Sequence, residues 1–248
     1  MPHVNQAASL YHLGCGERRL DGYVNVDLHP TSATDVVTDL TRPELSNAAG
    51  VFSNAFFEHL RRTTRVEHLR AIRRALQADG FACYLGLPDF RRVAELYLSG
   101  GPGVVGPRFD LFNVYRYTHG DPEMSPAADW EAQLHKSLFD VPELMRLLRD
   151  AGFPSYVVFR YVFPGEPPET DLSLGFYATA DRRATGALEL ACRRFLAAFD
   201  GQFLTAETLH FDDGRSRPAG IARLSATRQR SLLGRVAFAA SDRLARIA

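Results

Sequence analysis

The 248-residue sequence lacks a long hydrophobic run and an excess of charge of either sign. Its longest apolar run is about five residues, whereas a helix needs about 20 to cross a bilayer. Its 29 Lys and Arg balance 29 Asp and Glu, so it has none of the basic excess that sequence-independent nucleic-acid binding requires. Met1-Pro2-His3 opens no charged-then-apolar leader. We therefore expect a cytoplasmic protein without a transmembrane segment and without a nucleic-acid partner.

Cysteine and lysine are also scarce. Cys15, Cys83 and Cys192 are widely separated and form no Cys-x-x-Cys pair, so the sequence predicts neither a disulfide framework nor a structural zinc site. Lys136 is the only lysine, a bias toward arginine that is typical of a GC-rich genome rather than of a ligand preference. No residues have the spacing of metal ligands, and we expect no metal.

Hydrophobic and β-branched residues gather in short segments that end at Gly, Asp, Asn or Pro. We expect parallel strands at residues 9–13, 23–27, 35–39, 51–54 and 81–87. Residues 63–78 place apolar side chains on one face, which predicts an amphipathic crossover helix before the fifth strand. This alternation indicates an α/β protein with a doubly wound, mainly parallel sheet, whose ligand lies outside the carboxyl ends of the strands.

An insertion follows the fifth strand. Residues 90–135 begin with a short helix at 91–98 and continue as a Gly- and Pro-rich, loop-like stretch that keeps several aromatic residues. Long insertions of this kind are commonly lids, so we expect it to cover the acceptor site. A helix and two strands, at residues 141–151, 155–163 and 172–180, then complete a domain of residues 1–180.

Residues 181–248 predict a helical, basic C-terminal extension. Helices expected at 183–199 and 231–247 each have an apolar face, and residues 201–248 hold eight Arg against four acidic residues. These faces would pack on the parent domain or on a second copy in a homo-oligomer. The alternative is peripheral contact of the arginine-rich last helix with a membrane surface.

The strongest local signal is Leu13-Gly14-Cys15-Gly16, directly after the first strand. The glycines let the chain turn tightly and let a ligand approach the backbone. Asp27 closes the second strand, where a carboxylate can accept hydrogen bonds from both ribose hydroxyls of a nucleotide-like cofactor. The third glycine of the dinucleotide fingerprint is absent and Gly16 lies only eleven positions before Asp27, so no pyrophosphate cradle is built. The spacing therefore favours S-adenosylmethionine (SAM) over NAD.

Further segments join this motif: Asp21-Gly22-Tyr23-Val24-Asn25-Val26-Asp27, Asp35-Val36-Val37-Thr38-Asp39-Leu40-Thr41 and Phe52-Ser53-Asn54-Ala55-Phe56-Phe57-Glu58-His59-Leu60. Together they resemble successive motifs of Rossmann-type SAM-dependent methyltransferases, in particular the branch found in surface-polysaccharide and glycan gene clusters. The segments 69–90, 135–140 and 147–153 extend the resemblance over residues 9–180. Residues 76–80 depart from the usual leucine, Lys or Arg, Pro, Gly, Gly run, which indicates a divergent member.

The resemblance implies cofactor contacts at the ends of the first four strands. The glycine loop would face the methionine part of SAM, the acid of the second strand the ribose, the third strand the adenine and the fourth the sulfonium side. The residues implied are Leu13, Gly14, Cys15, Gly16, Asp27, Leu28, Asp39, Leu40, Asn54 and Glu58. For Asp39 a second interpretation is a turn acid or cap before Thr41, and Cys15 is assigned no redox or nucleophilic role.

Two histidines are candidates for catalysis. His135 follows the insertion and could act as the general base for a hydroxyl acceptor, with His59 as the next choice. The alternatives are that His135 anchors the return of the lid, that His59 is a partly buried structural histidine, and that Glu58 favours a helix start.

The leading hypothesis is methyl transfer from SAM to a hydroxyl of a sugar or glycan-like small molecule. The same fold could methylate a non-sugar small molecule. A catalytically silent SAM-fold module that binds a partner through its C-terminal helices is the alternative of a different class. An NAD-dependent dehydrogenase ranks third, because the third glycine is absent.

Overall fold

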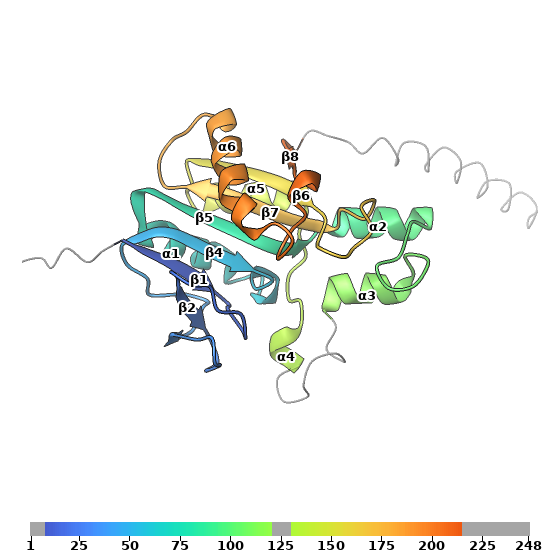
Figure 1. The fold of residues 1–248 in the computed structure, drawn as a ribbon, viewed down its shortest axis with the longest axis horizontal. Helices are drawn as coiled ribbons and strands as arrows, with labels where there is room; N and C mark the ends of the chain where they lie inside the picture. Colours follow the sequence, from blue (N-terminus) through green and yellow to red (C-terminus); the bar gives the residue numbers. More distant parts are fainter. Residues whose placement is uncertain (1–7, 121–129, 215–248) are drawn as a thin grey trace, which may run out of the picture. The chain divides into compact units, whose positions relative to one another are not determined.

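The structure, a computed structural model, describes residues 8–120 and 130–214 and has a single eight-stranded sheet in this part (Figure 1). The strand order is β3-β2-β1-β4-β5-β7-β6-β8. The strands are β1 (Ser9–Leu13), β2 (Val24–Asp27), β3 (Val36–Val37), β4 (Ala48–Asn54), β5 (Leu76–Pro88), β6 (Ser155–Tyr161), β7 (Ser173–Thr179) and β8 (His210–Asp212). The first five pair in parallel, β7 is antiparallel to β5 and β6, and β8 is antiparallel to β6. The predicted α/β class with a doubly wound, Rossmann-like sheet is confirmed.

Helices cover both faces of this sheet. On one face, α1 (Arg65–Ala75) and α5 (Val141–Asp150) bury their leucines in the main core, and on the other α6 (Thr185–Leu196) packs with the turn η3 (Ala197–Phe199). Side chains of β5 alternate between the two: Tyr84 faces the first core, and Cys83 and Leu85 face the second. A strand that is buried on both sides reads as a continuous apolar run, which is why β5 is visible in the sequence.

The C-terminal part of the described chain belongs to the sheet. The helix expected at 183–199 is formed by α6 and η3, and β8, preceded by the turn η4 (Ala206–Thr208), adds the edge strand. The expected boundary at 180/181 therefore falls within a compact unit that runs to Gly214. The helix expected at 231–247 lies outside the described residues.

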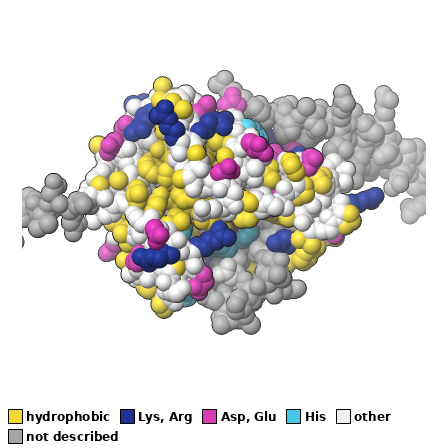
Figure 2. All heavy atoms as spheres, in the orientation of Figure 1, with side chains coloured by type: hydrophobic (Ala, Val, Ile, Leu, Met, Phe, Trp, Pro, Cys, Tyr) yellow, Lys and Arg dark blue, Asp and Glu magenta, His cyan; other side chains and the backbone are white. Residues whose placement is uncertain are grey.

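A mostly apolar hollow lies beside α6, and Figure 2 shows yellow side chains gathered there. Its lining consists of Leu10, Leu20, Asp21, Tyr23, Phe81, Arg194, Phe195, Ala198, Phe199 and Gln202. Among the described residues, no helix is long and apolar enough to cross a membrane.

The insertion is more ordered than the sequence predicts. After α2 (Phe90–Ser99), the expected loop contains a helix, α3 (Leu111–His119), and a short helix, α4 (Trp130–Gln133), follows the gap at 121–129. The loop prediction for this stretch is therefore wrong at α3. Asp110 caps α3 by accepting a hydrogen bond from the Asn113 backbone N–H at 3.1 Å, and the buried Asn113 amide bonds the Gly-rich loop before it. The Gly- and Pro-rich sequence before α3 predicts a loop. The start of the helix depends on these side-chain bonds, which hydrophobic periodicity does not reveal.

His68 on α1 generates a prediction about acid stability. It is fully buried, its Nδ1–H donates to the Leu40 carbonyl at 2.7 Å, and its Nε2 accepts from the Tyr84 hydroxyl at 2.7 Å. Burial lowers the pKa of His68 to about 4. Because the unfolded chain takes up a proton near pH 6.5, stability from this group is complete above about pH 6.5 and is lost as the pH falls through about 4, a change on the order of 3 kcal/mol.

We expect the free energy of unfolding of wild type to fall more steeply between pH 6.5 and 4 than that of His68→Gln, measured by urea denaturation. The exposed His210→Gln variant should follow wild type. Parallel curves for wild type and His68→Gln would show that His68 is not the titrating group.

Candidate functional site

The carboxyl ends of β1, β2 and β4 bring the predicted site residues to one edge of the sheet. The chain leaves β1 for β2 on one side, whereas β4 lies on the other side of β1, so the strand order changes direction between β1 and β4. Such a switch point is where open α/β sheets bind ligands. Gly14–Gly16 follow β1, Asp27 ends β2 and Asn54 ends β4.

The loop after β1 is held tightly. The backbone N–H groups of Gly14 and Cys15 both donate to the Val26 carbonyl, at 2.9 and 3.3 Å. Gly14 has a φ of +65°, and a Cβ there would lie 2.6 Å from the Cβ of Phe56. Only glycine therefore fits at this position.

Asp27 ties this loop to β2. Its Oδ2 accepts from the Gly16 N–H at 2.8 Å, and its Oδ1 accepts from the His29 N–H at 3.1 Å. A carboxylate has about four acceptor positions, so two remain for hydroxyl donors of a ligand. Leu28 beside it is 49% exposed, which leaves an apolar side chain next to the carboxylate.

The structure gives other predicted contacts a different character. Asp39 is exposed, and its carboxylate accepts from the Thr41 N–H at 2.8 Å and the Thr41 hydroxyl at 2.9 Å, the geometry of the turn-acid alternative. The side chains of Leu13 and Leu40 are buried in the main core, which leaves only their backbone groups for a ligand. Burial raises the pKa of the Cys15 thiol, so it stays protonated.

Two polar atoms after β4 are buried without a partner. Asn54 Oδ1 and Glu58 Oε2 accept no hydrogen bond from the residues that the structure describes. Glu58 is only 1% exposed. Because buried polar atoms are nearly always hydrogen-bonded in native proteins, these two atoms are open to a water, a ligand or an ion.

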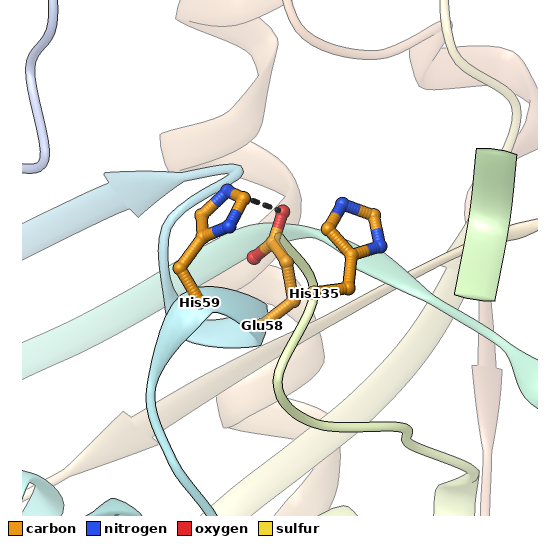
Figure 3. A group of neighbouring side chains, drawn as sticks. All are labelled: Glu58, His59 and His135. Carbon is orange, nitrogen blue, oxygen red and sulfur yellow. Dashed lines mark ion pairs between the residues drawn. The ribbon is translucent and has the colours of Figure 1, made fainter. Parts of the chain in front are cut away.

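Glu58, His59 and His135 form a cluster close to this point, which we call the Glu-His-His cluster. Glu58 and His59 lie on the turn η1 (Phe57–His59), and His135 comes from the segment after α4, so Figure 3 shows the two imidazole rings on either side of the Glu58 carboxylate. His59 Nε2 lies 3.8 Å from Glu58 Oε1, and the ring centroids of the two histidines are 5.2 Å apart. The structure thus brings both predicted catalytic histidines together.

Backbone hydrogen bonds hold the two segments of the cluster against each other. The Glu58 carbonyl accepts from the Lys136 N–H at 2.8 Å and the Ser137 N–H at 3.1 Å, and the Ser137 hydroxyl donates to the Leu60 carbonyl at 2.6 Å. The His135 N–H also donates to the His119 carbonyl at 3.0 Å. His135 therefore lies where the return of the insertion is fixed to η1.

Each histidine is oriented by a hydrogen bond from one ring nitrogen to a backbone carbonyl. His59 Nδ1 lies 3.0 Å from the Leu134 carbonyl, and His135 Nδ1 lies 3.1 Å from the Tyr117 carbonyl. A carbonyl only accepts, so Nδ1 carries the proton in both rings and Nε2 carries a lone pair. No hydrogen bond between described residues is donated to either Nε2, and the His59 ring also interacts with the Ala55 backbone, which acts to raise its pKa.

Burial sets the protonation states of the Glu-His-His cluster. It raises the pKa of Glu58 to about 8 and lowers the pKa of His59 to about 4. Burial also lowers the pKa of His135 below its usual value. Near neutral pH all three side chains are mostly uncharged, and both histidines can accept a proton or a cation at Nε2.

Sequence reasoning misses the groups that orient these side chains. The Leu134 and Tyr117 carbonyls are backbone groups, for which no side-chain pattern exists. It also misses Gly86. With φ at +80°, this glycine lets the Ala55 backbone approach so closely that a Cβ would lie 2.6 Å from the Ala55 nitrogen. Its signal in the sequence is a glycine within the apolar end of a strand.

No family model matches the sequence, and no curated protein matches it. Among solved structures, the chain is similar to the CMeT domain of citrinin polyketide synthase, at 13% identity and a TM-score of 0.42, over 73% of this chain and 48% of that chain. This chain thus spans about half the length of that one.

Two further similar structures are methyltransferases. One is a SAM-dependent methyltransferase from Thermotoga maritima, at 15% identity and a TM-score of 0.46, over 73% of this chain and 83% of that chain. The other is 1,6-didemethyltoxoflavin-N1-methyltransferase from Burkholderia thailandensis, with bound 1,6-didemethyltoxoflavin and S-adenosylhomocysteine. It matches at 20% identity and a TM-score of 0.44, over 71% of this chain and 72% of that chain. At this distance the likeness is one of fold, and nothing in these matches connects the chain to glycan biosynthesis.

Gly86→Ala should destabilise the protein by more than backbone strain alone. An alanine in the left-handed region costs about 1–2 kcal/mol, and here its Cβ would also meet the Ala55 backbone, which cannot rotate away. Gly22→Ala is the matched control, because Gly22 has a φ of +79° and a Cβ added there would have nothing within 4 Å. Equal unfolding free energies for the two variants, measured in urea, would contradict a close-approach role for Gly86.

Proposed function

We propose that the chain is a methyltransferase that uses SAM and acts on a small-molecule acceptor. The observation that carries the proposal is the loop of Gly14–Gly16, which is bonded through the Gly16 N–H to the Asp27 carboxylate at the switch point of the sheet. This loop offers close backbone approach and a carboxylate with two open acceptor positions, but no cradle for a pyrophosphate. Those properties suit an adenosine with a short charged substituent, as in SAM.

The neighbouring groups suit the other end of the cofactor. Asn54 Oδ1 is buried and unpartnered among the described residues, and an amide oxygen is a favourable neighbour for a sulfonium cation. Asn54 ends the strand next to the glycine loop, and the Glu-His-His cluster begins four residues later. The methyl group would then point toward that cluster, with the acceptor on its far side.

The proposed reaction is an in-line displacement. A lone pair of the acceptor oxygen forms the new O–CH₃ bond, the S–CH₃ bond breaks, and its electron pair stays on sulfur to give S-adenosylhomocysteine. The acceptor O–H proton leaves through the Glu-His-His cluster to water. The enzyme contributes mainly alignment of the two reactants and a group that assists loss of the proton.

The acceptor is proposed to bind between the cluster and the insertion at residues 90–135. A small cluster of buried residues packs α2 and α3 together, and His119 and Tyr117 of α3 are bonded to His135 through their carbonyls. A hydroxyl of a sugar or glycan-like molecule remains the predicted acceptor, and a cytoplasmic location and a homo-oligomer remain predictions from the sequence. The general-base hypothesis for His135, with His59 second, also remains a prediction.

S-adenosylhomocysteine should bind and stabilise the fold. At a hundred times its Kd it should add about 2.7 kcal/mol to the free energy of unfolding, a change that a melting assay detects. NAD at the same concentration should cause no shift. A shift with NAD and none with S-adenosylhomocysteine would remove the methyltransferase proposal.

Asp27→Ala should weaken the binding of S-adenosylhomocysteine by about 30- to 1000-fold, because it removes an acceptor for two hydroxyl donors. Asp21→Ala, which changes an exposed acid in the turn before β2, serves as the control. Calorimetric titration gives both affinities, and thermal melting shows whether each variant is folded. Unchanged affinity in a folded Asp27→Ala protein would mean that Asp27 only holds the loop.

A further inference from the structure

We propose that Glu58, His59 and His135 bind a single divalent transition-metal ion beside the glycine loop. The ligands are the Glu58 carboxylate and the Nε2 atoms of the two histidines. Ligand atoms of all three residues lie within 4.8 Å of one another. Binding of the ion is independent of methyl transfer, whereas its use in catalysis rests on the proposed function.

The histidines are oriented as metal ligands are. In metal sites the ligating imidazole donates its other N–H to a carbonyl or carboxylate, which fixes the tautomer and aims the lone pair. His59 and His135 both do this, through the Leu134 carbonyl at 3.0 Å and the Tyr117 carbonyl at 3.1 Å. Two histidines from segments far apart in the sequence thus lie on either side of the same carboxylate (Figure 3).

The second independent observation is Glu58. Its side chain is buried, and Oε2 has no partner among the described residues. A buried carboxyl without a cation or donor is costly, and a bound cation removes that cost by pairing with the ionised form. No arginine or lysine side chain forms an ion pair with Glu58 in the described part of the chain, and the His59 Nε2 that lies 3.8 Å from its carboxyl belongs to a mostly uncharged ring.

The distances require a small contraction. Ligand atoms about 2.1 Å from a tetrahedral ion lie about 3.4 Å from each other. His59 Nε2 and Glu58 Oε1 are 3.8 Å apart, so this pair nearly fits. Every other pair of ligand atoms lies within 4.8 Å, so reaching the tetrahedral spacing takes an approach of at most about 1.4 Å, which small rotations of the rings and the carboxylate would supply.

The donor set selects the class of ion. Two imidazoles and one carboxylate suit Zn²⁺, Co²⁺ or Fe²⁺, whereas Mg²⁺ and Ca²⁺ prefer oxygen ligands throughout. Three protein ligands leave at least one position open, as in catalytic rather than structural sites. An ion there would stabilise developing negative charge on the acceptor oxygen and would lower the pKa of its hydroxyl.

A metal site explains more of the cluster than a general base does. A general base needs only one free Nε2, and that of His135 is sufficient. The general-base hypothesis therefore gives no role to Glu58 or to the lone pair of His59. A cation uses all three groups at once. The sequence contains no indication of such a site, because Glu58-His59 and His135 have no ligand spacing along the chain.

The test is direct binding of Co²⁺, which reports inner-sphere imidazole and carboxylate ligands by its visible absorption spectrum. The full chain without a polyhistidine tag is stripped with a chelator and titrated with Co²⁺, and Zn²⁺ is then added as a competitor. We expect one Co²⁺ per chain, a ligand-field spectrum, and displacement by Zn²⁺. Mg²⁺ should not displace it.

Glu58→Gln and His135→Ala should each weaken Co²⁺ binding by about 100-fold or more, since the first replaces a charged carboxylate ligand with a neutral amide and the second removes an imidazole ligand. His210→Ala, an exposed histidine on β8, is the control and should bind as wild type does. Glu58→Gln keeps the shape of the side chain, and its melting curve shows whether it is folded. Should His135→Ala not fold, Glu58→Gln and His59→Ala still decide the question.

The proposal is overturned if wild type binds no Co²⁺, or if folded Glu58→Gln and His59→Ala bind it as wild type does. Titration with S-adenosylhomocysteine separates this failure from failure of the proposed function. Cofactor binding without Co²⁺ binding would leave the methyltransferase proposal intact and refute the metal site. Co²⁺ binding that depends on the three ligands, without cofactor binding, would support the metal site and refute the function.

Discussion

The close approach of two backbones at Gly86 and Ala55 is the constraint on which the candidate site depends. The Ala55 N–H donates to the Leu85 carbonyl at 3.0 Å, and Ala55 itself has a positive φ of 52°, so the chain turns sharply as β4 ends. The Gly86 N–H is satisfied by the Tyr161 hydroxyl at 2.6 Å. This turn starts η1 and thereby presents Glu58 and His59 at the ligand edge of the sheet. Without it, β4 would carry its last residues past that edge.

Hydrogen-bond partners distinguish His68 from the two histidines of the candidate site. His68 is buried like His59, and burial lowers the pKa of both to about 4. Both ring nitrogens of His68 have hydrogen-bond partners, the Leu40 carbonyl and the Tyr84 hydroxyl. The ring is therefore fully hydrogen-bonded and connects α1 to β5. In His59 and His135, a carbonyl holds Nδ1 and no described residue donates to Nε2. Burial alone therefore does not distinguish these rings, whereas their hydrogen-bond partners do.

The sequence predicts the features that local chemistry determines and misses those that depend on contacts between distant segments. Strand β1 has its predicted bounds. The glycine loop and Asp27 can be recognised in the sequence because a tight turn and an acid at the end of a strand are local signals. Helix α3 is a local feature that the sequence analysis misses all the same, because hydrophobic periodicity does not record the bond of Asn113 to Asp110 or its bond to the preceding loop. The meeting of η1 with His135 depends on two backbone N–H groups that share the Glu58 carbonyl. A sequence can therefore name these residues and still not show that they form one site.

The two halves of the site are built by different parts of the chain, and this division bears on specificity. In the proposed function, the sheet and its loops would supply the cofactor side, and the insertion after β5 would supply the acceptor side. Asp89 joins the two: its buried carboxylate caps α2 at the Arg91 N–H, at 3.1 Å, and pairs with Arg160 of β6 at 2.7 Å. Because that joint lies at the end of β5, residues of α2 and α3 can change without disturbing the glycine loop. Under the proposed function, acceptor choice is therefore expected to reside in the insertion, whose helix α3 is bonded to His135 of the Glu-His-His cluster.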